Sequence, residues 1–137
     1  MTKVAIDTAV LAAILDTHDK WNSKAIPMYT TFADEQIAFV YFDSVINEVI
    51  SVLSRRMGEQ KRIEQFETVL AKLTLEIPTT EITWISLHTQ EWFPEIVDLV
   101  KQHKGVLNFH DAMIALACKK ANIQYIASFD RDFGMVH

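Results

Sequence analysis

Four acidic residues stand beside apolar runs of this sequence, where an unpaired charge is costly. They are Asp7, Glu48, Asp111 and Asp130. A carboxylate that loses its water without gaining a partner costs free energy, or its pKa shifts until the group is neutral. Four such groups therefore suggest a shared countercharge, and a divalent cation bound by carboxylate oxygens would supply it.

Each acid taken alone also has a structural explanation. Asp7 can cap a helix that begins at Thr8, and Asp111 can be the acid of a capping box that Asn108 opens. Asp130 can lie in a turn that follows a strand. Glu48 is explained least, because helical spacing places it at the edge of an apolar stripe. Only the joint position of the four acids indicates a site.

The elements that carry the acids are predicted by the hydrophobic pattern. Short apolar strands at residues 4–6 and 125–127 come before Asp7 and Asp130, whereas Glu48 and Asp111 lie in helices. In an open parallel sheet, ligands bind in the crevice at the carboxyl ends of the strands. Two strand-end aspartates and two helix-borne acids can therefore converge at one edge of the sheet.

The rest of the chain predicts strands alternating with helices, which is typical of a mainly parallel sheet flanked by helices. Helices are expected over about residues 8–15, 19–32, 44–57, 59–73, 80–103 and 108–121, and strands at 4–6, 37–40, 75–77 and 125–127. Gly58 is expected to end the third helix as its C-terminal cap. Pro94 either kinks the fifth helix or begins a new one.

Composition sets the broad class of protein. The chain has 137 residues, of which half are hydrophobic and only three are Gly and three Pro, so one ordered α/β domain over residues 1–137 is expected. The net charge of −5 argues against a generally basic nucleic-acid-binding surface but leaves room for local basic patches. A single cysteine, Cys118, and the lack of a signal peptide or membrane-spanning run favour a cytoplasmic protein.

The four acids also predict a kind of metal and a kind of chemistry. Hard oxygen ligands, without a Cys/His pattern of zinc spacing, favour Mg²⁺ or Mn²⁺. Such ions, held by carboxylates, can activate a water for attack on a phosphodiester and neutralise charge on the leaving oxygen. The predicted chemistry is phosphoryl transfer.

Four segments of the sequence, in this order, closely resemble PIN-domain ribonucleases, especially the VapC-type toxins of toxin–antitoxin pairs. The segments are Ile6-Asp7-Thr8, residues 46–50 around Glu48, residues 110–115 around Asp111, and residues 128–133 around Asp130. The resemblance spans nearly the whole chain. It implies a PIN-like fold, Mg²⁺-dependent endoribonuclease activity on RNA, a cognate antitoxin and a homodimer.

The resemblance also implies roles for single residues. Asp7, Glu48, Asp111 and Asp130 would be the catalytic acids that hold Mg²⁺. Thr8 and Ser128 would be hydroxyl supports that orient a carboxylate or a water. Asp132 is a candidate accessory ligand. By its position between two aspartates, and not by the resemblance, Arg131 is a candidate for contacting phosphate or balancing the acids.

Other functions stay open at this point. The chain could be a housekeeping PIN-domain nuclease, or a non-catalytic binding module of the same fold. An aspartyl-phosphate phosphatase with Asp7 as nucleophile usually has a second acid two residues on, where this chain has Ala9. His110 is interpreted as a partly exposed neighbour of Asp111, and the tryptophans as core or interface anchors.

Overall fold

A four-stranded parallel sheet lies at the centre of the computed structural model, which describes residues 2–129. The strands are β1 (Lys3–Ile6), β2 (Ala38–Phe42), β3 (Ile82–Thr83) and β4 (Tyr125–Ala127), in the order β3-β2-β1-β4. Val4 of β1 pairs with Phe39 of β2 on one side and with Tyr125 of β4 on the other. The predicted α/β class with a parallel sheet is confirmed.

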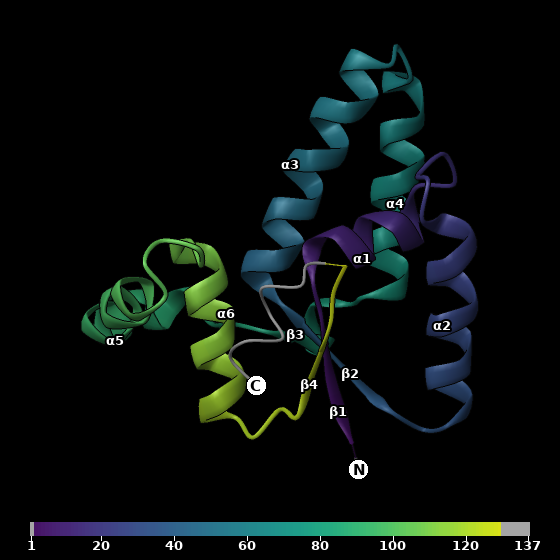
Figure 1. The fold of residues 1–137 in the computed structure, drawn as a ribbon. Helices are drawn as coiled ribbons and strands as arrows, with labels where there is room; N and C mark the ends of the chain where they lie inside the picture. Colours follow the sequence, from purple (N-terminus) through teal and green to yellow (C-terminus); the bar gives the residue numbers. More distant parts are fainter. Residues whose placement is uncertain (1, 130–137) are drawn as a thin grey trace.

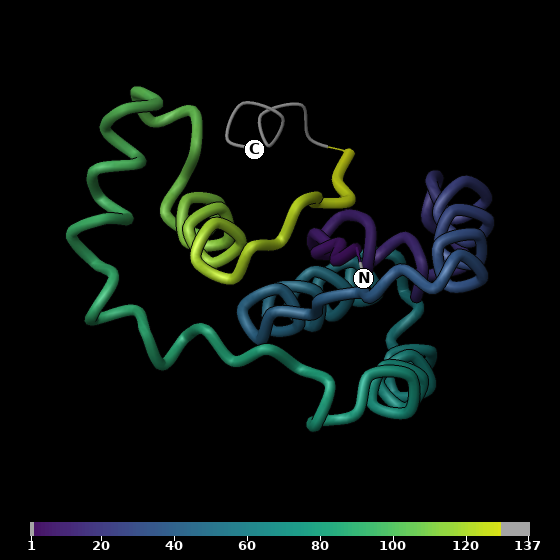
Figure 2. The backbone as a smooth tube through the Cα atoms, turned by 90° about the horizontal axis from the view of Figure 1, so that it is seen from below, coloured from purple at the N-terminus to yellow at the C-terminus, as the bar shows by residue number. Residues whose placement is uncertain are grey.

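Six α-helices flank the sheet in the part of the chain that the structure describes (Figure 1). They are α1 (Thr8–Leu15), α2 (Asn22–Asp34), α3 (Asp43–Glu59), α4 (Phe66–Glu76), α5 (Thr89–Gln102) and α6 (Phe109–Lys120). Viewed from below, α5 and α6 lie on one side of the strands and α2 on the other (Figure 2). The pair α3 and α4 extends beyond the carboxyl ends of the strands, where α1 also begins (Figure 1).

Helix α1 is the centre of the core. Every residue of α1 except Ala9 is buried, and the short side chains of Ala12 and Ala13 let neighbouring elements approach closely. Helix α6 repeats this pattern, since all of its residues from Ala112 to Cys118 are buried. Both helices are apolar around most of their circumference, as expected for helices covered on several sides.

The end of α3 differs from the expected glycine cap. Gly58 lies inside the helix, and Lys61 is the residue with left-handed backbone geometry (φ 56°). The Arg62 N–H donates to the Met57 carbonyl at 2.7 Å and the Lys61 N–H to the Gly58 carbonyl at 3.3 Å. These two bonds form a Schellman motif, which satisfies the last carbonyls without a glycine at the left-handed position.

Two other expected elements are wrong. Residues 75–77 are not a strand: Leu75 and Glu76 form the last turn of α4, and Leu75 is 82% exposed. The predicted helix over residues 80–103 is replaced by β3, a short connection and α5, which begins at Thr89 and runs through Pro94. Short segments of this kind depend on tertiary packing more than on local pattern.

Helix α2 begins at Asn22, three residues after the expected start, and β2 extends to Phe42 rather than ending at Val40. By contrast, α1, α6 and β4 occupy the predicted positions within a residue or two. In the part of the chain that the structure describes, no helix is both long and apolar enough to span a membrane.

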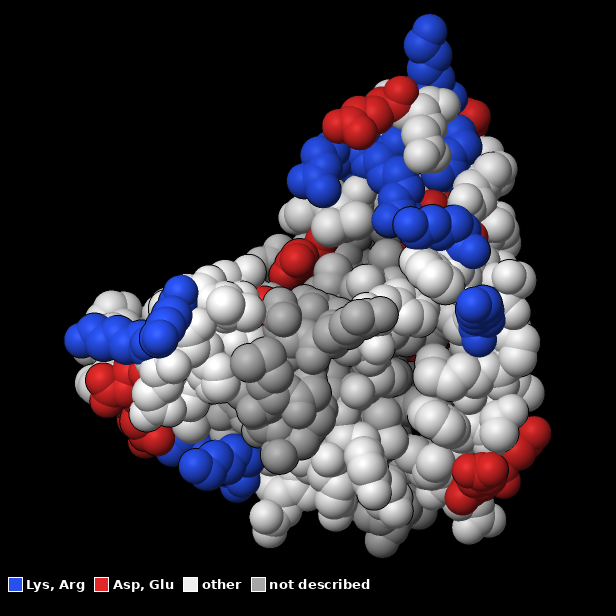
Figure 3. Space-filling model, in the orientation of Figure 1, with Lys and Arg blue, Asp and Glu red and all other residues white. Residues whose placement is uncertain are grey.

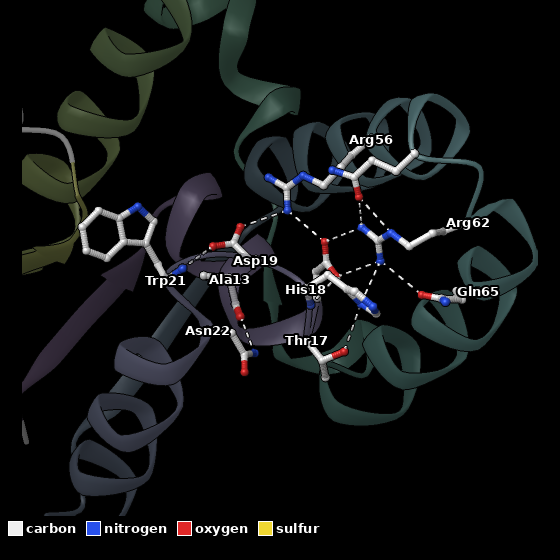
Figure 4. A network of polar contacts seen from close by, with 11 residues as sticks. Ala13, Thr17, His18, Asp19, Trp21, Asn22, Arg56, Arg62 and Gln65 are labelled. Atoms are coloured by element: carbon white, nitrogen blue, oxygen red, sulfur yellow. Dashed lines mark hydrogen bonds and ion pairs between the residues drawn. The ribbon is translucent and has the colours of Figure 1, made fainter.

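A buried ion-pair network ties the end of α1 to the end of α3 (Figure 4). Asp16, which is 2% exposed, accepts hydrogen bonds from Arg56 at 3.0 Å and from Arg62 at 3.2 Å. Burial by itself raises the pKa of Asp16. Hydrogen bonds from Arg62, the His18 backbone N–H and Arg56 outweigh this effect, so the pKa is lowered. The network therefore stabilises the folded state with Asp16 charged.

Replacing Asp16 with alanine is expected to destabilise the protein by about 3 kcal/mol at neutral pH, because two arginines lose a buried partner. The pKa of Asp16 is lower in the folded than in the unfolded state. Its contribution is thus present above the ordinary carboxyl pKa of about 3.9 and is lost as the pH falls through the lower folded-state value. Urea unfolding of wild type and Asp16→Ala at several pH values measures the difference.

The matched control is Glu95→Ala, which removes the exposed ion pair that Glu95 forms with Lys120 at 3.1 Å. Its expected cost is under about 1 kcal/mol, as for other surface pairs. Equal effects of the two substitutions would contradict the importance assigned to the Asp16 network.

Candidate functional site

Asp7 lies where β1 ends and α1 begins, and both of its carboxylate oxygens are held. Oδ1 accepts the Thr8 backbone N–H at 2.8 Å, so Asp7 is the N-cap of α1. Oδ2 accepts the Ser128 hydroxyl at 3.0 Å. The Asp7 N–H also donates to the Ala127 carbonyl at 3.1 Å, which brings the residue after β4 beside the carboxylate. Asp7 therefore links β1, α1 and β4.

The charge of Asp7 is only partly compensated. Asp7 is only 8% exposed, and this burial raises the pKa of its carboxyl group above the ordinary value. The hydrogen bonds from Thr8 and Ser128 and the nearby His110 lower the pKa, whereas the nearby Glu48 raises it. No lysine or arginine among residues 2–129 forms an ion pair with Asp7.

Glu48 reaches the same region from α3. Its side chain is 45% exposed, and its Oε2 lies 2.8 Å from Nε2 of His110, in the first turn of α6. The approach is close enough for an ion pair, but the ring N–H is not aligned for a hydrogen bond. Because both residues also act on Asp7, the structure brings α1, α3 and α6 together at this end of the sheet.

Asp111 lies in the first turn of α6, immediately after His110. Its backbone N–H donates to Oδ1 of Asn108 at 2.8 Å, so the predicted Asn108 cap is present. The cap fixes the start of α6 and with it the positions of His110 and Asp111. Asp111 itself is half-buried.

Three buried polar atoms have no hydrogen-bond partner in the described chain. They are Thr8 Oγ1, Ser44 Oγ and His110 Nε2. Each belongs to one of the first two residues of a helix, namely α1, α3 and α6. Buried polar groups are normally paired, and helix N-termini carry partial positive charge. Because His110 Nε2 lies against Glu48, the Thr8 and Ser44 hydroxyls are the two groups that lack a polar neighbour here within the described chain.

Two of these residues were not expected from the sequence as parts of a site. Ser44 lies one turn before Glu48 on the same face of α3, and this spacing was the available signal. His110 was interpreted as a neighbour of Asp111, whereas it contacts Glu48 directly. Its place in the first turn of α6 pointed toward the site, but the pairing with α3 depends on tertiary structure.

Among the expected site residues, Asp7, Ser128 and Glu48 are linked by the contacts described above, and His110 joins them. Asp111 follows His110 in the first turn of α6. The Thr8 hydroxyl does not bond to Asp7; its backbone N–H does. Asp130, Arg131 and Asp132 lie outside the described residues. Within residues 2–129, no three His, Cys, Asp or Glu side chains are grouped closely enough to form a metal site.

The PIN domain family matches residues 4–136. The crystal structure of Mycobacterium tuberculosis VapC20, a Sarcin-Ricin loop cleaving toxin, is similar with a TM-score of 0.71 and 21% identity, over 96% of this chain and 93% of that one. VapBC2 from Rickettsia felis, crystallised with a DNA fragment from its promoter, gives a TM-score of 0.70 and 15% identity, over 98% and 93%.

No significant match is found among curated protein sequences. The two structural similarities, at 21% and 15% identity, concern the fold alone. The family match covers nearly the whole sequence and includes all four acids. This chain belongs to the PIN domain family.

Proposed function

We propose that this protein is a Mg²⁺-dependent endoribonuclease and the toxin of a toxin–antitoxin pair. The observation that carries the proposal is the buried Asp7 carboxylate, which has no lysine or arginine partner in the described chain. The similar VapC20 is itself described as a Sarcin-Ricin loop cleaving toxin, which supports RNA as the substrate class.

The residues present fit a divalent cation. Asp7 offers carboxylate oxygens in a buried setting that lacks a full countercharge, and Glu48 is near enough to raise the pKa of Asp7. A hard divalent cation would relieve both costs, because it prefers oxygen ligands and favours the charged carboxylates. Asp7, Glu48, Asp111 and Asp130 are the residues proposed to hold Mg²⁺, with Mn²⁺ as a substitute.

When bound, the metal would activate a water and neutralise charge on the leaving oxygen of a phosphodiester. The chain itself would supply orientation. Ser128 and the Thr8 N–H fix the two oxygens of Asp7, and the N-termini of α1, α3 and α6 favour a negatively charged phosphate at this edge of the sheet. Thr8 Oγ1 and Ser44 Oγ are buried next to these N-termini and have no hydrogen-bond partner in the described chain.

The proposed partners are a cognate antitoxin and a second copy of this chain, in addition to RNA. The similar VapBC2 from Rickettsia felis was crystallised bound to promoter DNA. A housekeeping nuclease with the same acids is the alternative. The two differ in whether expression of the protein alone harms the cell.

The purified protein should cleave single-stranded RNA in the presence of Mg²⁺ and lose this activity with a chelator. Asp7→Asn should lower the rate by at least about 100-fold, because a weakened metal site gives up several kcal/mol of transition-state stabilisation. Gel analysis of labelled RNA measures cleavage. Asp98→Asn, an exposed substitution on α5, is the control and should cleave at the wild-type rate.

Equal cleavage by wild type and Asp7→Asn would show that Asp7 is not part of the active site and would contradict the proposed metal site. Expression of the wild type alone should also stop bacterial growth, whereas Asp7→Asn should not. Cleavage in vitro without growth arrest would favour the housekeeping alternative.

Asp7→Asn should make the metal-free protein more stable, by about 1 kcal/mol or a few degrees in Tm. Asparagine keeps the N-cap of α1 but removes a buried charge that burial disfavours. With saturating Mg²⁺, wild type should become the more stable of the two proteins. At a Mg²⁺ concentration of about 100 Kd, binding would stabilise wild type by about 3 kcal/mol and the variant by much less.

Thermal unfolding with EDTA and with Mg²⁺ measures both values. The readout does not depend on catalysis, so it tests the metal site separately from nuclease activity. If Mg²⁺ stabilised both proteins equally, Asp7 would not be a ligand.

A further inference from the structure

A cleft of about 380 Å³ adjoins the proposed active site. Its lining includes Ala9, Asp19, Lys20, Trp21, Arg56 and Phe129. Two of these residues connect it to the acids: Ala9 is in the first turn of α1, two residues after Asp7, and Phe129 follows Ser128, which bonds to Asp7. A polymer bound at the acids would therefore reach this cleft with its next unit.

One wall of the cleft is aromatic. The rings of Trp21 and Phe129 lie 5.2 Å apart at an angle of 30°, and Phe129 is 41% exposed. Such an aromatic pair offers a platform for a nucleobase, since every base has a π face and stacks with little regard to sequence. The exposed ring of Phe129, beside the proposed active site, is placed to stack with a base of the substrate.

The same cleft carries positive charge in an acidic protein. The Nζ atoms of Lys20 and Lys24 lie 5.5 Å and 5.0 Å from the centre of the Trp21 ring. Figure 3 shows that lysine and arginine side chains gather on the part of this face over the end of α3 and the chain between α1 and α2. Local positive charge beside an aromatic platform is the combination by which proteins bind single-stranded nucleic acid.

Arg56 is held in place at the cleft. Its Nη1 donates both to Asp16 at 3.0 Å and to Asp19 at 2.9 Å (Figure 4). Its Nε and Nη2 make no hydrogen bond to another residue of the described chain, so they remain as donors. Asp19, the acid in the cleft, is occupied by Arg56 and by the Trp21 backbone N–H at 2.8 Å. A fixed guanidinium with unused donors suits a phosphate.

We propose that this cleft, called here the Trp21–Phe129 cleft, binds the nucleotide next to the cleaved phosphodiester of a single-stranded RNA. The base stacks on the exposed ring of Phe129, which packs against Trp21, and the adjacent phosphates contact Lys20, Lys24 and Arg56. The proposal rests on the proposed nuclease function and adds to it a subsite for the substrate strand.

The test measures binding of a short fluorescein-labelled single-stranded RNA by fluorescence anisotropy, with Asp7→Asn as the parent protein and EDTA present so that no cleavage occurs. Phe129→Ala and Trp21→Ala should each weaken binding about tenfold or more. Phe129→Tyr should bind as the parent does, because the ring is kept. Phe93→Ala on α5 is the matched control, because Phe93 is also an exposed phenylalanine that pairs with another ring, at 52% exposure against 41% for Phe129.

The lysines are tested by salt dependence. Lys20→Ala combined with Lys24→Ala should reduce the slope of log K against log salt by about 1.4, since each phosphate of a single strand that a lysine neutralises adds about 0.7 to the slope. Lys101→Ala combined with Lys119→Ala, two exposed lysines elsewhere, should leave the slope unchanged. Thermal unfolding of each variant identifies any that is not folded, and the Phe129 and lysine variants carry the test if Trp21→Ala fails to fold.

RNA cleavage by the otherwise wild-type chain is measured in parallel, so the two proposals can fail separately. Cleavage by the wild type, with parent-like RNA binding by Phe129→Ala and by the double lysine variant, would overturn the cleft and leave the nuclease standing. Weaker binding by these variants with no cleavage by the wild type would support the cleft and overturn the nuclease. Equal affinity for duplex RNA would overturn the assignment to a single strand.

Discussion

The burial of the Asp7 carboxylate is the constraint on which the rest of the site depends. Its two oxygens hold the start of α1 through the Thr8 N–H and the segment after β4 through Ser128. The same burial raises its pKa, so the fold positions a charge that it does not fully stabilise. The capping explanation and the functional explanation of Asp7 are therefore not alternatives. The cap places the carboxylate, and the missing countercharge is what the proposed cation would supply.

The two ends of α1 each carry a buried carboxylate, and the two carboxylates differ in how their negative charge is balanced. Asp16 at the C-terminal end is less exposed than Asp7, yet two arginines and the His18 backbone N–H lower its pKa. Asp7 at the N-terminal end receives neutral donors and one nearby histidine, and its pKa is raised. The chain thus supplies arginines to one buried acid of a helix and, in its described part, none to the other. This contrast is what a site for an external cation requires.

Much of the fold could be predicted because its strongest signals are local. The apolar runs of β1, α1, α6 and β4, and the cap at Asn108, lie where the sequence places them. The end of α3 could not be predicted from Gly58, because a Schellman motif formed with Lys61 at the left-handed position. Leu75 looks like part of a strand in isolation, but it is an exposed residue in the last turn of α4.

The candidate site could be predicted from the sequence to about the same extent as the fold. The acids next to apolar runs are visible in the sequence, and Asp7 lies at the end of a central strand as expected. The approach of His110 to Glu48 joins residues far apart in the chain, so no local pattern could reveal it. The sequence likewise could not show that the hydroxyls of Thr8 and Ser44 are buried, because this depends on where α1 and α3 begin relative to the sheet.

Arg56 connects the stability of the fold to the proposed binding of RNA. One nitrogen of its guanidinium bridges Asp16 and Asp19, and Arg56 is also one of the residues that line the Trp21–Phe129 cleft. A net charge of −5 does not prevent an anion from binding there, because charges beyond about 8–10 Å are largely screened at physiological salt. What decides binding is the local arrangement, and the buried acids fix that arrangement. The carboxylates of Asp16 and Asp19 therefore hold in place the Arg56 guanidinium that an RNA phosphate would contact.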